Sequence, residues 1–168
     1  MYIETARLLI TDFTLDMSRD VHLNSLDEDN RRFVPDEVFE TIEEAEETLA
    51  FLIEAYAGSD GPYVHPIFRR DDGANIGYVQ AVRVEEGFEL GYHIAKPYTG
   101  CGYASEAVSA FLPVILERLG ISEMLGVALE DNKASHRVLE KSGFRLVFEG
   151  AAPYQGEERL IRKYLYKK

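Results

Sequence analysis

The segment KPYTGCGYASEA, residues 96–107, is the part of the chain whose composition best suits ligand binding. Gly100 and Gly102 stand between an apolar, strand-like stretch and a long helical pattern. A turn of this kind leaves backbone N–H groups free at a helix N-terminus, where the helix dipole also favours an anion. Because glycine lets the backbone approach an anion closely, the segment indicates a phosphate or pyrophosphate site. Taken alone, it is equally consistent with a tight strand-to-helix turn.

The same segment departs from two common nucleotide motifs. A dinucleotide fingerprint needs a third glycine where Ser105 stands, and a P-loop needs a Gly-Lys-Ser/Thr sequence that is absent. A protein that binds ATP or NAD through these glycines is therefore the less favoured hypothesis.

A second motif, LEDNKASHRVLEKSGF at residues 129–144, also follows an apolar stretch and opens a helical pattern. Asn132 stands where a helix cap is expected, and Ser135 follows three residues later on the same face. Together with ETARLLITDFT, NIGYVQAV and FELGYHIAKPYTGCGYASEAV, the two motifs resemble the GNAT superfamily of N-acetyltransferases. The resemblance covers nearly the whole chain and is strongest to the RimJ/RimL-type branch, the ribosomal-protein N-terminal acetyltransferases.

The resemblance implies a single GNAT domain over residues 1–168 with an α+β fold. Its mixed, mostly antiparallel sheet would be flanked by helices, with splayed central strands holding the coenzyme. The resemblance further implies acetyl-CoA as co-substrate, no metal, and direct attack of a primary amine on the acetyl group. The family's pyrophosphate loop commonly begins with Gln or Arg, where this chain has Pro97. Because that loop binds mainly through its backbone, coenzyme A binding is still expected.

The residues that the resemblance assigns to the coenzyme lie in the two motifs. The pyrophosphate would meet the backbone of residues 99–104, the pantetheine arm would pair with the backbone of residues 94–96, and Asn132 would bond the pantetheine as well as cap its helix. A backbone N–H at Ile94 or Ala95 is the expected donor to the acetyl oxygen. The full predicted set is Ile94, Ala95, Lys96, Thr99, Gly100, Cys101, Gly102, Tyr103, Ala104 and Asn132.

Catalytic candidates follow from what amine acetylation requires, a base for the amine and an acid for the departing thiolate. Ser135 is the candidate acid by resemblance to related enzymes of this branch, whereas other GNAT proteins use a nearby tyrosine. Glu89 and His93 are the candidate bases, because a spacing of four places both on one face of a predicted strand. Glu89 resembles an acid often found early in this strand in the family, and histidine has the more suitable intrinsic pKa. A water chain in place of either base stays open.

The other reactive side chains give weaker indications. Cys101 lies in the glycine segment, but a cysteine nucleophile needs a base and a geometry that the sequence does not show. The four histidines have no ligand spacing, so no metal site is predicted; they are His22, His65, His93 and His136.

Apolar periodicity predicts the elements that must position these residues. Strands are expected at 2–11, 63–70, 76–84, 88–95, 124–129, 144–150 and 158–167, helices at 41–58, 102–119 and 132–142, and an irregular or helical cover at 13–30. Thr41 and Glu44 form a capping-box pattern. Pro113 is expected to kink or split the long helix.

Length and composition bound the function. A chain of 168 residues with 46% hydrophobic residues can bury the core of one ordinary domain. Its single cysteine and the absence of a secretory or membrane-length apolar run favour a reduced cytoplasm. The formal net charge of −12 disfavours nucleic acid as a partner, and either serves solubility or attracts a cationic acceptor.

The sequence leaves the acceptor open between a protein N-terminus and a small amine. Acceptor contacts are expected from residues 22–40 and 150–159. A catalytically silent acyl-CoA-binding module, acting as a sensor or interaction protein, is the alternative function. A homodimer formed through an exposed apolar face is a further hypothesis.

Overall fold

The computed structural model describes all 168 residues, which form one eight-stranded sheet with five α-helices. The strands follow the order β1-β2-β3-β4-β5-β6-β8-β7, and every neighbouring pair is antiparallel except β5 and β6. The strands are β1 Tyr2–Glu4, β2 Leu8–Thr11, β3 Tyr63–Arg69, β4 Asn75–Val84, β5 Gly87–Ile94, β6 Glu123–Leu129, β7 Arg145–Tyr154 and β8 Glu157–Lys167. The helices are α1 Ser18–Ser25, α2 Glu28–Phe33, α3 Ile42–Ala55, α4 Tyr103–Leu119 and α5 Lys133–Lys141. This is the predicted α+β architecture.

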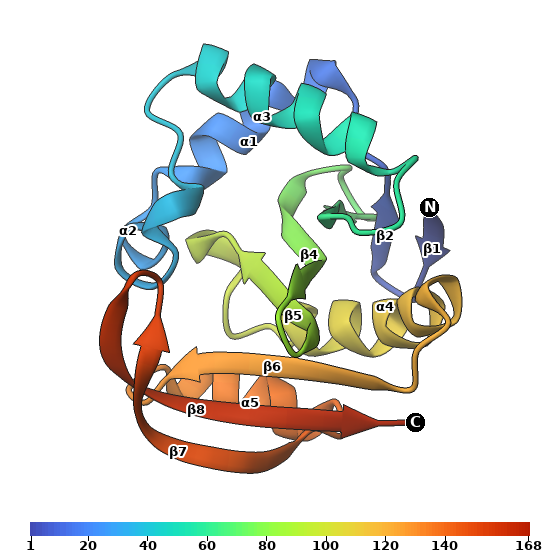
Figure 1. Cartoon of the computed structure of the whole chain (residues 1–168). Helices are drawn as coiled ribbons and strands as arrows, with labels where there is room; N and C mark the ends of the chain where they lie inside the picture. The colour runs from blue at the N-terminus through green and yellow to red at the C-terminus, as the bar shows by residue number, and fades with distance from the viewer.

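The helices cover the sheet from both sides, with α1 and α3 on one side of β4 and β5 and α4 on the other (Figure 1). The main core lies between α4 and the sheet, where Phe111 and Ile115 pack among fully buried strand residues such as Ile76 and Val79. A smaller cluster of Phe13, Leu49, Leu52 and Val64 joins α3 to β3. Burial of these apolar side chains fixes the two helical layers and holds the centre of the sheet between them.

The sheet opens between its only parallel strands. β5 and β6 pair at two positions, Glu89 with Leu125 and Leu90 with Gly126, and have no further ladder pairs. Residues 91–94 of β5 therefore have a partner strand only on the β4 side. This divergence confirms the predicted splay of the central strands, and it exposes one row of β5 backbone groups to the gap.

Two predicted elements differ from the structure. Residues 2–11, expected as a single strand, form the hairpin β1–β2, because Thr5 turns the chain: its Oγ1 accepts from the Leu8 N–H at 2.9 Å.

Pro113 neither splits nor ends α4, which is one continuous helix from Tyr103 to Leu119. Pro113 and Ser109 lie on the exposed side of α4. The Ser109 carbonyl that loses its N–H partner can therefore bond to water.

Candidate active site

A cleft of about 670 Å³ opens where β5 and β6 diverge. Its lining comes from β4 and β5, the end of β6, α5 and the tip of the β7–β8 hairpin. The loop after β5 at residues 99–102, the glycine loop, also lines it. The volume is in the range typical of small-molecule sites. The splay of the sheet thus brings the two sequence motifs to opposite walls of one cavity.

The glycine loop presents an unsatisfied helix N-terminus to this cleft. Gly100 and Gly102 have φ values of 75° and 82°, and Gly102 is the N-cap of α4. The N–H groups of residues 100–105 donate no hydrogen bond within the protein, whereas that of Thr99 donates to the Lys96 carbonyl at 3.2 Å. A Cβ added to Gly100 would have nothing within 4 Å. Free donors beside open space suit a pyrophosphate. Thr99 was predicted among these backbone donors, but its N–H is already used within the protein.

The β1–β2 turn holds the glycine loop in place, a relationship that sequence patterns did not indicate. Arg7 donates from Nη1 to the Cys101 carbonyl at 3.0 Å and from Nε to Glu106 Oε2 at 2.7 Å. Its guanidinium also stacks 4.5 Å from the centre of the Tyr103 ring. Thr5 Oγ1 adds a hydrogen bond of 2.6 Å to Glu106. In the sequence, only the ETARL stretch could have indicated these contacts, because the partners lie about a hundred residues apart.

The end of β5 separates the two candidate donors to an acetyl oxygen. The Ala95 N–H donates to the Ile76 carbonyl at 2.8 Å and so belongs to the ladder with β4. Antiparallel pairing alternates, so the Ile94 N–H points the other way, into the gap beside β6. Lys96 is tied to α2, since its Nζ lies 2.7 Å from Asp29 Oδ2. Of the two donors, Ile94 is the free one.

The Asn132 motif brings two polar side chains, Asn132 and Ser135, to the cleft, where Ser135 meets Tyr92 of β5. Asn132 Oδ1 accepts from the Ser135 N–H at 3.1 Å, which confirms the predicted helix cap and leaves the Asn132 amide free to donate. Ser135 Oγ lies 2.7 Å from the phenol oxygen of Tyr92, and that phenol also donates to the Ser135 carbonyl at 3.0 Å. Burial raises the pKa of Tyr92, so the phenol stays protonated. Ser135 is therefore paired with a tyrosine instead of acting alone.

Glu89 and His93 both line the cleft and alternate with the buried Phe88, Leu90 and Ile94, as predicted. Burial raises the pKa of Glu89 to about 7, with Glu86 adding to the shift and Lys163 opposing it. Burial lowers the pKa of His93 despite the nearby Asp27 and Asp29. His93 Nε2 faces Asp27 Oδ2 at 3.4 Å, so this nitrogen is directed at α2.

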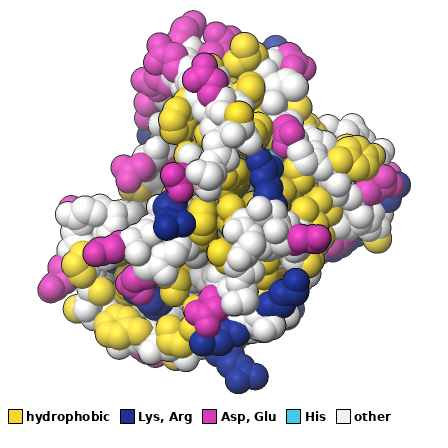
Figure 2. Space-filling view, turned by 45° about the vertical axis from the view of Figure 1, so that its right-hand side comes forward, with side chains coloured by type: hydrophobic (Ala, Val, Ile, Leu, Met, Phe, Trp, Pro, Cys, Tyr) yellow, Lys and Arg dark blue, Asp and Glu magenta, His cyan; other side chains and the backbone are white.

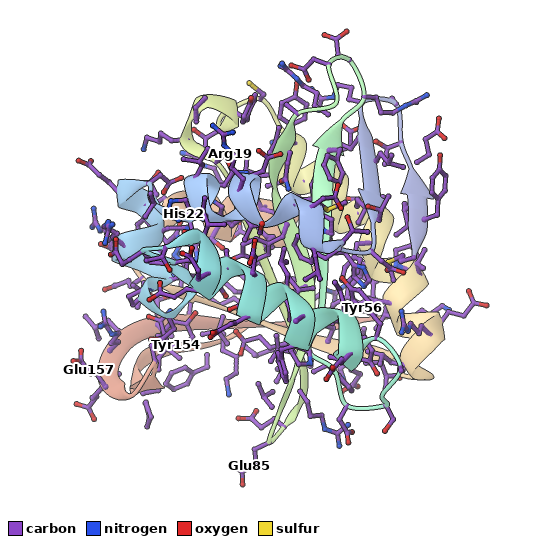
Figure 3. The ribbon with its side chains drawn as sticks, turned by 90° about the horizontal axis from the view of Figure 1, so that it is seen from above. Arg19, His22, Tyr56, Glu85, Tyr154 and Glu157 are labelled. Atoms are coloured by element: carbon purple, nitrogen blue, oxygen red, sulfur yellow. The ribbon has the colours of Figure 1, made fainter.

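The two segments expected to contact the acceptor meet across the cleft. Gln155, at the tip of the β7–β8 hairpin, donates from Nε2 to the Phe33 carbonyl at the end of α2, at 2.7 Å. Figure 3 shows Tyr154 at the same end of the molecule as the blue α1–α2 segment. Burial, together with the charges of Glu89 and Glu37, raises the pKa of Tyr154 to about 12. The phenol therefore remains a hydrogen-bond donor beside two carboxylates.

Glu37 is a further carboxylate of the cleft, in addition to Glu89, Asp29 and Asp36, and the sequence did not single it out. Burial raises its pKa to about 7, against a hydrogen bond from Gln80 and with some help from Asp36. It lies in the short turn Pro35–Glu37, where no periodic pattern marks a residue as buried. Only its position within the 22–40 acceptor segment could have pointed to it.

The other reactive side chains lie apart from this chemistry. Cys101 is exposed, and its Sγ contacts the Thr99 carbonyl at 3.6 Å. No three His, Cys, Asp or Glu side chains form a group that could hold a metal ion. No helix is both long and apolar enough to span a membrane. Figure 2 shows acidic side chains gathered at the top of the molecule, the end that carries α3.

The splayed sheet and the free N–H groups of the glycine loop form a cleft that suits a phosphate-bearing ligand. The chain belongs to the GNAT acetyltransferase family, whose Acetyltransferase (GNAT) domain model matches residues 7–145. The chain is therefore an acetyltransferase of that family.

Relatives and solved structures agree with this assignment. The chain is 28% identical over 147 residues to the uncharacterized N-acetyltransferase YnaD of Bacillus subtilis, covering 86% of this chain and 83% of YnaD. A GNAT-family acetyltransferase structure from Bacillus anthracis has a TM-score of 0.84 at 24% identity, over 99% of this chain and 98% of that one. RimL, a ribosomal L7/L12 α-N-protein acetyltransferase solved with coenzyme A, has a TM-score of 0.85 at 18% identity, with coverages of 99% and 98%. These structures share the fold described above.

Proposed function

We propose that this protein transfers the acetyl group of acetyl-CoA to a primary amine, on a protein N-terminus or a small molecule. The observation that carries the proposal is the placement of free N–H groups at residues 100–105 and of the Ser135–Tyr92 pair on one cleft. The first feature suits the pyrophosphate of coenzyme A, and the second suits the sulfur that leaves. RimL, which shares the fold, was solved with coenzyme A. The single cysteine fits a cytoplasmic setting.

The proposed coenzyme site runs from the glycine loop to the splay. The N–H groups of Gly100 to Ala104 receive the pyrophosphate, and Arg7 holds their loop from behind. The pantetheine arm lies in the gap between β5 and β6, where the backbone of Ile94 and the side-chain amide of Asn132 bond it. Of the predicted backbone at residues 94–96, the N–H groups of Ala95 and Lys96 already donate to the Ile76 carbonyl and to Asp27 Oδ2. Cys101 serves as a backbone donor, with its side chain turned to solvent.

The proposed transfer needs four groups of this chain. Glu89 takes a proton from the acceptor ammonium, directly or through water, so that the neutral nitrogen attacks the acetyl carbon and a C–N bond forms. The Ile94 N–H stabilises the negative charge that develops on the acetyl oxygen. As the C–S bond breaks, the thiolate takes a proton from Ser135, which Tyr92 orients through their 2.7 Å contact. The excess proton on the nitrogen of the new amide passes through water to the Ser135 oxygen, which restores the hydroxyl. His93, whose Nε2 faces Asp27, is the second candidate base.

Release of free thiol from acetyl-CoA in the presence of amines tests the proposal. A panel of glycinamide, leucinamide, a polyamine and short N-terminal peptides is expected to include at least one acceptor that stimulates release well above the rate without amine. Binding of acetyl-CoA with no amine-dependent release across the whole panel would instead favour the sensor function.

A homodimer stays part of the proposal for the quaternary structure. The edge strand β7 exposes Leu146, Val147 and Phe148, and an apolar edge strand is a common pairing surface. Sedimentation equilibrium of the wild-type chain and of Phe148→Glu tests it: a dimer that dissociates in the variant supports pairing through β7, and a monomeric wild type contradicts it.

A further inference from the structure

A second cavity, of about 340 Å³, adjoins the coenzyme cleft on the side of α1 and α3. Its apolar wall consists mainly of Phe13, Val21, Phe39, Leu49, Leu52 and Val64. Six residues line both cavities, namely Asp36, Glu37, Tyr78, Gln80, Val82 and His93. The two spaces therefore meet along one short boundary, and a molecule in the cleft can extend a side group into the second cavity.

Glu37 lies on that boundary, and only one of its two carboxylate oxygens has a hydrogen-bond partner. Gln80 donates from Nε2 to Glu37 Oε1 at 3.1 Å, whereas the buried Oε2 accepts no hydrogen bond. A buried carboxylate oxygen without a donor is costly, so this oxygen is suited to receive a donor from a ligand.

The position of Gln80 depends on a glycine in the neighbouring strand. Gly91 is the register partner of Gln80, and a Cβ on Gly91 would lie 2.6 Å from Gln80 Nε2 and 2.8 Å from its Cγ. The missing side chain lets Gln80 lie across β5 and reach Glu37. Gly91 is thus a positioning residue, and an alanine there would displace a flexible side chain without touching the backbone ladder.

The charges around the second cavity restrict what can enter it. Asp36 and Glu37 line it, and no lysine or arginine does. A carboxylate on the acceptor would lie beside Asp36 and Glu37 with no lysine or arginine to compensate its charge, so like-charge repulsion disfavours it. Asn30 also lines the cavity; it is 1% exposed and its Oδ1 has no donor, so it can accept an N–H from the ligand. The cavity therefore suits an apolar group next to an amine and an uncharged amide.

We infer that Glu37 binds the amino group of the acceptor and that the second cavity holds the apolar substituent beside that amine. The acceptor is then a primary amine with a compact apolar substituent and no carboxylate next to the amino group, such as an amidated or peptide-bonded apolar residue. This inference rests on the proposed acetyl transfer, and it names the acceptor class for that same cleft.

Three acceptors test the inference through amine-dependent thiol release: glycinamide, leucinamide and leucine. Leucinamide is expected to exceed glycinamide in kcat/KM by about tenfold or more, since even one methylene in a fitted pocket is worth about 10–200-fold. Leucine, which differs from leucinamide by its carboxylate, is expected to fall about 100-fold below leucinamide. Equal rates for leucine and leucinamide, or for leucinamide and glycinamide, would overturn the inference.

Variants test whether the second cavity causes the preference for leucinamide over glycinamide. Val21→Phe fills the apolar wall and is expected to lower the leucinamide-to-glycinamide ratio, while Val114→Phe, on the outer face of α4, keeps the wild-type ratio. Glu37→Gln is expected to raise the KM for leucinamide about tenfold with the KM for acetyl-CoA unchanged, and Glu47→Gln serves as its exposed control. Gly91→Ala should change the acceptor KM in the same direction.

The outcomes separate this inference from the proposed function. Thiol release that is stimulated by glycinamide but shows no preference among the acceptors rejects the inference and keeps the acetyltransferase. No stimulation by any amine rejects both. A leucinamide preference that Val21→Phe leaves intact also rejects the inference, because the substituent would then lie elsewhere.

Discussion

The hydroxyl oxygen of Ser135 lies 2.7 Å from the phenol oxygen of Tyr92, across the gap between α5 and β5. Either hydroxyl can be the donor in this contact, and the Tyr92 phenol also lies 3.0 Å from the Ser135 carbonyl oxygen, which can only accept. When the phenol donates to Ser135 Oγ, the Ser135 proton is free to point to the splay, where the sulfur of the co-substrate would leave. Tyr92 then positions the Ser135 hydroxyl.

Ser135→Ala is expected to lower kcat by about 10²-fold or more, because a general acid typically contributes 10²–10⁴-fold. Tyr92→Phe should lower kcat less, since the serine proton remains. Steady-state thiol release at saturating acetyl-CoA measures both effects. Ser109→Ala, exposed on α4, is the control. Full turnover in Ser135→Ala, or a larger loss in Tyr92→Phe, would move the acid role to the tyrosine.

The pH dependence of turnover tests Glu89 as the base. Its pKa of about 7 predicts that kcat rises with pH through about 7, as the carboxyl loses its proton. Glu37, with a pKa of about 7 as well, contributes to the profile at low acceptor concentration. The profile is therefore recorded at saturating acceptor. Glu89→Gln should lose the rising limb together with most of kcat; an unchanged limb in Glu89→Gln and its loss in His93→Gln would assign the base to His93.

The same raised pKa values make folding stability depend on pH. A carboxyl that titrates at about 7 in the folded chain and near 4.5 when unfolded holds its proton more tightly in the folded state. Its contribution is therefore fully present below about pH 4.5 and is lost as the pH rises through about 7. Glu89→Gln should gain about 1–3 kcal/mol relative to wild type between pH 5 and pH 8. Urea unfolding at both pH values measures this gain, and a wild-type-like slope in the variant would contradict it.

Arg7 should control coenzyme affinity although it lies outside both sequence motifs. Arg7→Ala removes the hydrogen bond to the Cys101 carbonyl and the ion pair with Glu106, so the free N–H groups of the loop lose their fixed direction. The KM for acetyl-CoA is expected to rise about tenfold, the value of one charge-assisted hydrogen bond, with a smaller effect on kcat. Arg19→Ala, an exposed arginine of α1, is the matched control. Equal KM values in the two variants would show that the loop is rigid by itself.

Features set by neighbouring residues were predictable from the sequence. Gly100 and Gly102 mark a turn because their positive φ is a local property, and Asn132 marks a helix start because its cap bond spans three residues. The period-two pattern likewise placed Glu89 and His93 on the cleft side of β5. These local features predicted the order of strands and helices and the residues that we propose for the coenzyme.

Features set by contacts between distant segments were not predictable. Gln80 reaches Glu37 over 43 positions, and Arg7 reaches Glu106 over 99. No spacing rule links such pairs, because the folded sheet alone brings them together. The hairpin at residues 2–11 was missed for a smaller reason: Thr5 turns the chain with a side-chain hydrogen bond, in a sequence whose apolar content resembles a single strand. The contacts that we propose for the acceptor therefore needed the structure.

Movement of an acetyl group from acetyl-CoA to an amine in this cleft is tested most directly by following free thiol and acetylated amine in the same reaction, with leucinamide as acceptor and the wild-type chain as catalyst. Both products are expected to appear together, one acetylated amine for each thiol, and Ser135→Ala is expected to slow both equally. Thiol release without acetylated amine, or tight acetyl-CoA binding with neither product for any amine tested, would contradict this acetyl transfer.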